Sequence, residues 1–329
     1  MEIEKPKLVY VSDEDPGFTR HKWGRGFIYK NEDGVKISDQ VIIQRIKDLV
    51  IPPIWQEVWI CPDETGHLQS TGKDMKSRKQ YIYHTEWVAY NQQTKFARLK
   101  KFGSTLPIIR AQVEKDLRDK DWSRKKVCAL VVHLLDEHYL RIGNQYYTDR
   151  NKTYGLTTLR RKHLDATKSS ITFNYKAKSN KHREIKIEDQ RLVSLIKEIS
   201  DLPGYEVFRY KDESTKWTSI DSSDVNEYIN NISGKPFTAK DFRTWAGTKL
   251  AIEYYDKAKE EVSQNKRLTL EPTLIKKVAK SLGNTVATCR KYYIHPAVLE
   301  AVVSNGVNTT ASYTDEHLED SEQLILDLI

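Results

Sequence analysis

The chain has 329 residues, of which 38% are hydrophobic and 30% are charged, and its formal net charge at pH 7 is +8. This length is enough for two domains with separate cores. No apolar run approaches the roughly 18 residues of a membrane-spanning helix, and the N-terminus lacks the basic and apolar regions of a secretory signal. We therefore expect a protein of the cytoplasm that has no part in the membrane.

The N-terminal part of the chain has the pattern of a small strand-rich domain. Residues 1–70 contain short apolar runs that are broken by turn signals, such as D-E-D-P-G and N-E-D-G. From about Asn91 the apolar residues recur at longer, helical periods. The predicted fold is therefore α+β, with a strand-rich domain at 1–90 and a larger, mainly helical domain at 91–329.

The larger domain is predicted to contain a long helix and one β-hairpin. Segment 127–140 repeats apolar residues at helical spacing, and Gly143 is expected to end that helix. Segment 170–188 alternates apolar and polar residues on both sides of Ser179-Asn180, which predicts a hairpin with this pair at its tip.

Two further helices are predicted from their first residues. Thr238 and Asp241 form a capping box in F-T-A-K-D-F, which indicates the start of a helix. Thr285 is expected to cap a short helix that carries two adjacent tyrosines, Tyr292 and Tyr293, in a basic setting. Packed aromatics and a nucleophilic hydroxyl are both compatible with such a pair.

The end of the chain is acidic, and the rest is strongly basic. Residues 311–329 contain six acids and no lysine or arginine. Because they contribute −6 to the net charge of +8, residues 1–310 carry +14. A basic body indicates a polyanionic partner, nucleic acid first, although a solvated basic surface has the same composition. The acidic tail itself has three interpretations: a docked helix, a solvated helix, or a segment that competes with DNA for the basic surface.

Several familiar kinds of site are not supported by the sequence. In G-H-L-Q-S-T-G-K-D five residues separate the glycines, where a phosphate loop has four, and Asp74 stands where that loop needs a hydroxyl. The nine histidines and three cysteines show no metal-ligand spacing. We therefore expect no metal, no ATP and no other cofactor.

Basic residues stand at the ends of the predicted elements. Arg141 follows the long helix, Lys178 lies near the hairpin tip, and Lys240 and Arg243 are three apart in the first turn of the capped helix, hence on one face. Singly, such residues usually serve a helix dipole or face solvent. Together with a tyrosine they suit attack on a phosphodiester, because arginines hold phosphate oxygens and a lysine protonates the departing oxygen.

In the order of its motifs the chain closely resembles the type IB DNA topoisomerases of the compact poxvirus and bacterial kind, most of all the bacterial branch. The likeness begins near residue 15 and ends near residue 300, with landmarks S-R-K-Q-Y-I-Y-H, L-R-I-G-N-Q-Y-Y, K-D-F-R-T-W-A-G-T and L-G-N-T-V-A-T-C-R-K-Y-Y-I-H-P. The resemblance implies a catalytic domain of the tyrosine recombinase and type IB topoisomerase kind. It also implies relaxation of supercoiled DNA through a transient 3′-phosphotyrosyl link, without ATP or metal.

The same resemblance implies catalytic roles for five side chains: Arg141, Lys178, Arg243, Asn284 and Tyr293. The nucleophile is the tyrosine directly before I-H-P, which is Tyr293, and its neighbour becomes a packing residue. Asn284 stands where the poxvirus enzymes have histidine, and its amide N–H can donate to a phosphate oxygen without titrating. The lysine comes from the hairpin pattern Y-K-A-K, in which Ala177 replaces the glycine of the family, so Lys176 and Lys181 remain alternatives for the general acid.

Further residues are expected to bind DNA: Arg78, Gln80, Tyr81, Tyr83, Tyr147 and Lys240. Glutamine pairs well with adenine in the major groove, although a strand with alternating aromatics also explains the segment around Gln80. The expected partner is double-stranded DNA, which the protein wraps as a monomeric clamp, with nucleoid association if the source is bacterial.

Two other functions are considered for the same residues. A tyrosine site-specific recombinase shares the chemistry and the catalytic fold, but such enzymes usually have histidine three residues before the second arginine, where this chain has Lys240. A catalytically silent DNA-binding protein is disfavoured, because every chemical role is still filled by a suitable residue.

Overall fold

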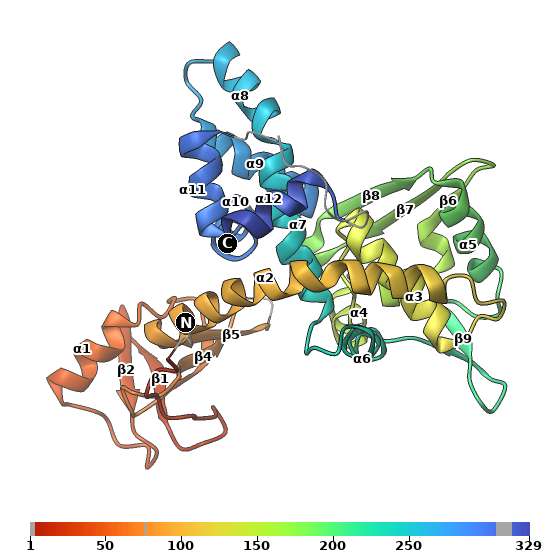
Figure 1. Ribbon diagram of the computed structural model, residues 1–329. Coiled ribbons are helices and arrows are strands. Elements are labelled where there is room, and N and C mark those ends of the chain that lie inside the picture. The colour runs from red at the N-terminus through yellow and green to blue at the C-terminus, as the bar shows by residue number, and fades with distance from the viewer. Residues whose placement is uncertain (1–3, 76, 307–317) are drawn as a thin grey trace. The chain divides into compact units, whose positions relative to one another are not determined.

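The computed structural model describes residues 4–75, 77–306 and 318–329 (Figure 1). The chain divides into two compact units, Met1–Ala97 and Arg98–Ile329. The division falls within helix α2 (Thr85–Asp116), whereas the sequence analysis places the boundary at residue 90.

A five-stranded antiparallel sheet forms the centre of the first unit, in the order β2-β1-β3-β4-β5. Its strands are β1 (Phe18–Trp23), β2 (Gly26–Lys30), β3 (Gln56–Ile60), β4 (Leu68–Lys73) and β5 (Lys79–Tyr83). The prediction of a strand-rich N-terminal domain is therefore confirmed.

One helix of the first unit is not expected from its turn-rich sequence. Helix α1 (Gln40–Asp48) begins where the Asp39 carboxylate accepts hydrogen bonds from two backbone N–H groups of the first turn. Ile46 on this helix is buried with Val58 and Ile60 of β3. An N-terminal cap and one buried face are enough to form a short helix among strands.

The second unit is mainly helical, as predicted. Its helices are α3 (Arg124–His138), α4 (Gln145–Asn151), α5 (Gln190–Ser200), α6 (Ser222–Ser233), α7 (Ala239–Glu253), α8 (Tyr255–Gln264), α9 (Leu270–Leu282), α10 (Val286–Tyr292), α11 (Pro296–Asn305) and α12 (Asp320–Leu328). Its strands are β6 (Leu164–Ala166), β7 (Ile171–Lys176), β8 (His182–Ile187), β9 (Arg209–Lys211) and β10 (Trp217–Ser219). Short 3₁₀ turns are η1 (Leu156–Thr158), η2 (Arg161–His163) and η3 (Lys178–Asn180).

Helix α7 lies at the centre of this unit and contacts α3, α9, α11 and α12 (Figure 1). Nearly all of its residues are buried, which is the pattern of a helix surrounded by others. Its predicted start is confirmed, because the backbone N–H of Thr238 donates to the Asp241 carboxylate at 2.7 Å. The predicted cap of α10 is confirmed as well, because the Thr285 hydroxyl accepts from the Thr288 N–H at 3.2 Å.

The predicted hairpin is confirmed as the antiparallel pair β7 and β8, which β6 extends to a three-stranded sheet. At its tip Ser179 and Asn180 have positive φ values of 64° and 58°. Serine and asparagine tolerate this left-handed region better than β-branched residues do.

Among the helices that the structure describes, none combines the length and the apolar character that a membrane span requires.

The prediction that Gly143 ends the long helix is wrong. Helix α3 stops at His138, and Tyr139 adopts the left-handed conformation with φ 54°. Gly143 instead has φ 97° and lies against Gly155: a Cβ on Gly143 would lie 3.0 Å from the Gly155 carbonyl carbon, and a Cβ on Gly155 would lie 2.6 Å from the Gly143 Cα. The backbone of Arg141 accepts a hydrogen bond in the same contact, from the Leu156 N–H at 2.9 Å. The two glycines thus fix the loop that carries Arg141.

Candidate active site

The loop after helix α9 gathers two arginines from distant parts of the chain. Gly283 ends α9 with φ 63°, which turns the backbone carbonyls of this loop toward the arginines. Arg243 Nη2 donates to the Leu282 carbonyl at 2.8 Å, and Arg141 Nη2 donates to the Gly283 carbonyl at 3.3 Å. Arg243 also donates to the Tyr139 carbonyl. Backbone carbonyls therefore orient both guanidinium groups.

Asn284 lies between these two arginines. Its Oδ1 accepts hydrogen bonds from Arg141 and, at 3.4 Å, from Arg243. Its Nδ2 is buried and has no hydrogen-bond partner among the described residues. Because a buried donor without a partner is costly, this N–H is suited to an acceptor that a ligand would bring.

The two guanidinium groups form an electropositive site. Burial lowers the pKa of Arg141, and it lowers that of Arg243 to about 10, an effect to which the neighbouring Arg141 charge adds. Only 5% of Arg243 is exposed. Neither group has a carboxylate partner within the parts of the chain that the structure describes. Phosphate oxygens would supply the missing counter-charge.

Tyr293 stands at the C-terminal end of α10, directly beside Arg243. The guanidinium carbon of Arg243 lies 5.4 Å from the centroid of the tyrosine ring. The Tyr293 N–H donates to the Cys289 carbonyl at 2.9 Å, and its carbonyl accepts from the Thr248 hydroxyl at 3.4 Å. The backbone approaches α7 so closely that a Cβ on Gly247 would lie 2.3 Å from the Tyr293 carbonyl oxygen.

The three hairpin lysines differ in their contacts. Lys181 Nζ donates to the backbone carbonyl of Asn284 at 2.7 Å. Lys178, in the 3₁₀ turn at the tip, is exposed, and so is Lys176 at the end of β7. The structure therefore brings together Arg141, Arg243, Asn284 and Tyr293, and among the described residues Lys178 makes no hydrogen bond or ion pair with them.

No role is predicted from the sequence for the α7 residues that contact the backbone of Tyr293. Gly247 and Thr248 lie in the K-D-F-R-T-W-A-G-T motif, and Thr248 also accepts a hydrogen bond from the His295 N–H at 3.0 Å. A glycine in the interior of a predicted helix is the signal that points to such a contact, since it weakens the helix and permits close packing.

The expected DNA contacts of the first unit lie on two faces of strand β5. Tyr81 and Tyr83 are 48% and 40% exposed, and their rings stack with centroids 5.9 Å apart. Gln80 points to the other face, because side chains alternate along a strand, and it donates to the Asp74 carboxylate at 3.0 Å. Arg78 pairs with the same carboxylate at 2.6 Å.

The expected contacts of the second unit are both accessible. Tyr147 on α4 is 58% exposed and packs edge to face on Tyr146. Lys240 is exposed in the first turn of α7, whereas Arg243 is buried. The two basic residues of that turn are three positions apart, but only Lys240 is accessible from outside. Tyr292 is 40% exposed.

No group of three or more histidine, cysteine, aspartate or glutamate side chains that could hold a metal occurs within residues 4–75, 77–306 and 318–329. The three cysteines are free thiols in buried positions: Cys61, Cys128 and Cys289.

Comparison with known proteins identifies the family. The eukaryotic DNA topoisomerase I catalytic core matches residues 76–318, and the bacterial DNA topoisomerase IB N-terminal domain matches residues 26–74. DNA topoisomerase 1B of Acanthamoeba polyphaga mimivirus is 30% identical over 88% of this chain and 88% of the relative. DNA topoisomerase 1B of Vaccinia virus (strain Copenhagen) is 21% identical over 80% of this chain and 82% of the relative.

Among solved structures, a post-cleavage complex of the XerH site-specific recombinase with palindromic difH substrate has a TM-score of 0.37 and 13% sequence identity. The aligned part covers 61% of this chain and 49% of that chain. The two family matches together extend from residue 26 to residue 318. The chain therefore belongs to the type IB DNA topoisomerases.

Proposed function

We propose that Tyr293 is the nucleophile of this DNA topoisomerase and that Arg141, Arg243 and Asn284 bind the phosphate it attacks. The main support for the proposal is the arrangement of these side chains around Tyr293. The buried guanidinium group of Arg243, the half-buried one of Arg141 and the buried amide N–H of Asn284 converge beside the ring of Tyr293. These are the groups that a phosphodiester in a trigonal-bipyramidal transition state requires, because negative charge builds on its non-bridging oxygens.

The proposed reaction exchanges one ester for another. The Tyr293 oxygen forms a bond to phosphorus, the bond from phosphorus to the 5′ oxygen breaks, and the products are a 3′-phosphotyrosyl link and a free 5′-hydroxyl. The proton lost by the phenol is balanced by the proton gained by the 5′ oxygen. Since the number of phosphoester bonds is unchanged, the 5′-hydroxyl can reverse the reaction after the duplex has rotated, without ATP.

Lys178 is the proposed general acid for the 5′ oxygen. The family pattern of the hairpin supports this choice, and so does the engagement of Lys181 with the Asn284 carbonyl, which gives that rival lysine a structural contact. An exposed lysine at a hairpin tip is free to approach bound DNA.

We also propose that the protein wraps double-stranded DNA as a monomeric clamp. Candidate contacts occur in both units, with the exposed Tyr81 and Tyr83 in the first and Tyr147 and Lys240 in the second. The net charge of +14 on residues 1–310 supports binding to the phosphate backbone.

A plasmid relaxation assay in EDTA and without ATP tests the proposal. The wild-type protein should relax any supercoiled plasmid, and Tyr293→Phe should relax none while still binding DNA. Relaxation that requires two paired sites would favour a recombinase. Binding without relaxation by the wild-type protein would favour a catalytically silent DNA-binding protein.

A further inference from the structure

The C-terminal helix α12 is held on the second unit by a carboxylate that is completely buried. Glu322 is 0% exposed, and its two oxygens accept hydrogen bonds from Arg110 at 2.7 and 2.9 Å. Burial alone would raise the pKa of Glu322, but the hydrogen bonds from Arg110 lower it below its ordinary value. A buried carboxylate is costly unless it is paired in this way, so these contacts determine where α12 lies.

The same network joins α12 to three other helices. Arg110 on α2 also binds Asp136 on α3, at 2.7 and 3.2 Å. On α7, the indole N–H of Trp245 donates to Glu322 at 2.8 Å, and Lys249 donates to Glu319 at 2.6 Å. Trp245 and Lys249 are four residues apart and therefore lie on one face of α7. Helix α12 and its N-cap residue Glu319 thus hold α7 at two points one turn apart.

A glycine on α2 seats the indole of Trp245. A Cβ on Gly103 would lie 2.2 Å from the Trp245 ring and 2.9 Å from Cδ2 of Leu326 on α12. The ring is therefore enclosed by α2 and α12, and its N–H points at the buried carboxylate. Movement of Trp245 would require both helices to shift, because interiors are close-packed.

The turn of α7 that contains Trp245 also holds the active site. Arg243 precedes Trp245 by two residues, and Gly247 and Thr248 follow it and contact the backbone of Tyr293. Residues within one turn of a helix move together, so a displacement at Trp245 is passed on to the guanidinium and the nucleophile.

We infer that Glu322 is a positioning residue for strand cleavage, because through Trp245 and Arg110 it sets the place of α7 and hence of Arg243 and Tyr293. The inference rests on the proposed roles of Arg243 and Tyr293. In this arrangement residues 318–329 are a component of the catalytic unit and not a segment that acts on DNA.

The test uses the full-length protein with Glu322→Gln, which keeps the side-chain volume and removes the charge that faces Arg110. Single-turnover cleavage of a short duplex is measured at saturating protein, and the Kd for the same duplex is measured separately. We expect the cleavage rate constant to fall about 10- to 100-fold, since a misplacement of about 1 Å has effects of this order, with the Kd unchanged. A fraction of misfolded protein would lower the amplitude of cleavage and leave the rate constant as it is.

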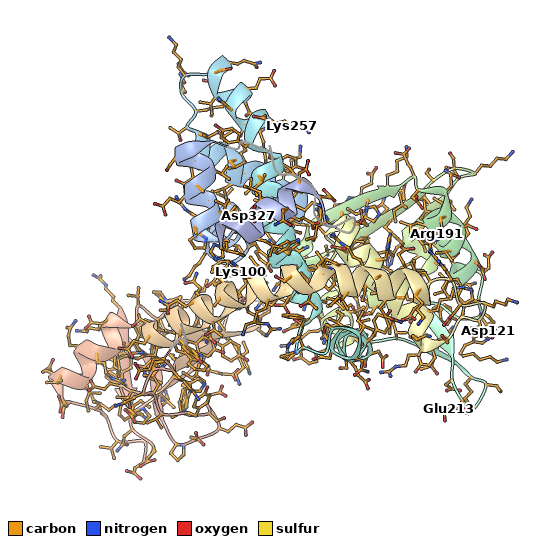
Figure 2. The ribbon with its side chains drawn as sticks, in the orientation of Figure 1. Lys100, Asp121, Arg191, Glu213, Lys257 and Asp327 are labelled. Carbon is orange, nitrogen blue, oxygen red and sulfur yellow. The ribbon has the colours of Figure 1, made fainter. Side chains whose placement is uncertain are left out.

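Two further variants make the test specific. Asp327→Asn removes an equal charge from an exposed position of the same helix (Figure 2) and should keep the wild-type rate constant. Glu319→Gln removes the charge that faces Lys249 and keeps the contacts of Glu322 with Arg110 and Trp245, so it should lower the rate constant by less than Glu322→Gln does.

The inference is overturned if Glu322→Gln cleaves at the wild-type rate, if Asp327→Asn is slowed to the same extent, or if the Kd alone changes. Should Glu322→Gln fail to fold, Trp245→Phe removes the N–H that donates to Glu322, and a wild-type rate constant in that variant overturns the inference. Tyr293→Phe serves as the parallel control in the same assay. A covalent adduct in that variant would contradict the proposed role of Tyr293. Such a result differs from those that overturn the inference about Glu322, so the two failures can be distinguished.

Discussion

At the scale of single residues, Asn284 shows how one amide serves two purposes in the site. Its oxygen accepts hydrogen bonds from the two arginines, while its buried N–H, which has no partner among the described residues, is the proposed donor to a phosphate oxygen. Histidine at this position would change its charge between about pH 5 and 8. The asparagine donor does not titrate, so its contribution to phosphate binding should be independent of pH in that range.

Replacing Asn284 by aspartate should raise the stability of the protein and abolish its activity. The carboxylate of Asn284→Asp would pair with Arg141 and Arg243, and relieve the cost of burying two like charges, so the free energy of unfolding at pH 7 should rise by about 1–2 kcal/mol. This pairing keeps the pKa of the new carboxylate low, so the gain is present above about pH 4 and is lost as acid protonates it. Strand cleavage should be nearly abolished, because the carboxylate repels the phosphate. Unfolding by urea at pH 7 and pH 3, together with a cleavage assay, checks both effects, and a less stable variant at pH 7 would contradict the argument.

The nucleophile can be distinguished from its neighbour by the covalent adduct. Tyr293→Phe should form no adduct with DNA and should bind the duplex nearly as well as the wild type, because only one hydroxyl is lost. Tyr292→Phe is the matched control and should remain active, since Tyr292 is 40% exposed and it is the Tyr293 ring that lies beside Arg243. Denaturing gels of labelled duplex report the adduct. An adduct that persists in Tyr293→Phe and disappears in Tyr292→Phe would move the nucleophile by one position.

The general acid can be identified with a substrate whose leaving 5′ oxygen is replaced by sulfur. A thiolate needs little protonation, so the loss of about 10²- to 10⁴-fold expected for Lys178→Ala should be restored on this substrate. Arg141→Ala should not be rescued, because the proposed role of Arg141 is to stabilise the phosphate. Lys181→Ala should be slowed on both substrates alike, since Lys181 supports the Asn284 backbone. Rescue of Lys181→Ala or Lys176→Ala instead would transfer the role to that lysine.

At the scale of elements, α7 is the part of the fold on which the site depends. Its capping box can be predicted from Thr238 and Asp241, because the two partners are only three residues apart in the sequence. The end of α3 cannot be predicted in the same way. Tyr139, and not a glycine, adopts the left-handed conformation that ends the helix, and Gly143 is needed for its contact with Gly155. Features that depend on neighbouring residues can thus be predicted from the sequence. The role of a glycine that contacts a distant residue, such as Gly143, cannot.

Gly247 makes the dependence on α7 testable. Gly247→Ala would place a methyl group 2.3 Å from the Tyr293 carbonyl oxygen, so the segment that carries Tyr293 must move away from the helix. We expect a loss of about 1–3 kcal/mol in stability and a fall of about 100-fold in the cleavage rate. Gly26→Ala is the control, because a Cβ at Gly26 meets no atom within 4 Å. Thermal melts and single-turnover cleavage measure the two effects. Cleavage by Gly247→Ala at the wild-type rate would contradict the proposed dependence of the site on α7.

At the scale of the whole molecule, the acidic end of the chain is the feature that the family resemblance leaves unexplained. Residues 320–328 form α12, and Leu318 and Ile325 are buried, which agrees with a docked helix and excludes a fully solvated one. Asp315 and Glu316 lie outside the described residues. The partners of Glu322 could not be predicted, because Arg110 and Trp245 are 212 and 77 residues away in the chain, and no local pattern links them.

Deleting residues 312–329 distinguishes the docked helix from a tail that competes with DNA. Competition predicts that the truncated protein binds non-specific DNA more tightly and with a steeper salt dependence, since acids near the phosphates are removed. The docked helix predicts a different result, because Glu319 and Glu322 already bind Lys249 and Arg110. Truncation would then leave the Trp245 N–H without its acceptor and lower the free energy of unfolding by about 3–5 kcal/mol.

The salt dependence of DNA binding and urea unfolding should be measured on the same preparations, because the two interpretations differ in both. A truncated protein of wild-type stability that binds DNA more tightly at low salt would show that the acids act on the DNA surface. We expect instead a destabilised protein whose remaining folded fraction has the same affinity and salt slope as the full chain. That outcome follows from the burial of Glu322, since a carboxylate with 0% exposure cannot repel a phosphate at the surface without first leaving its site.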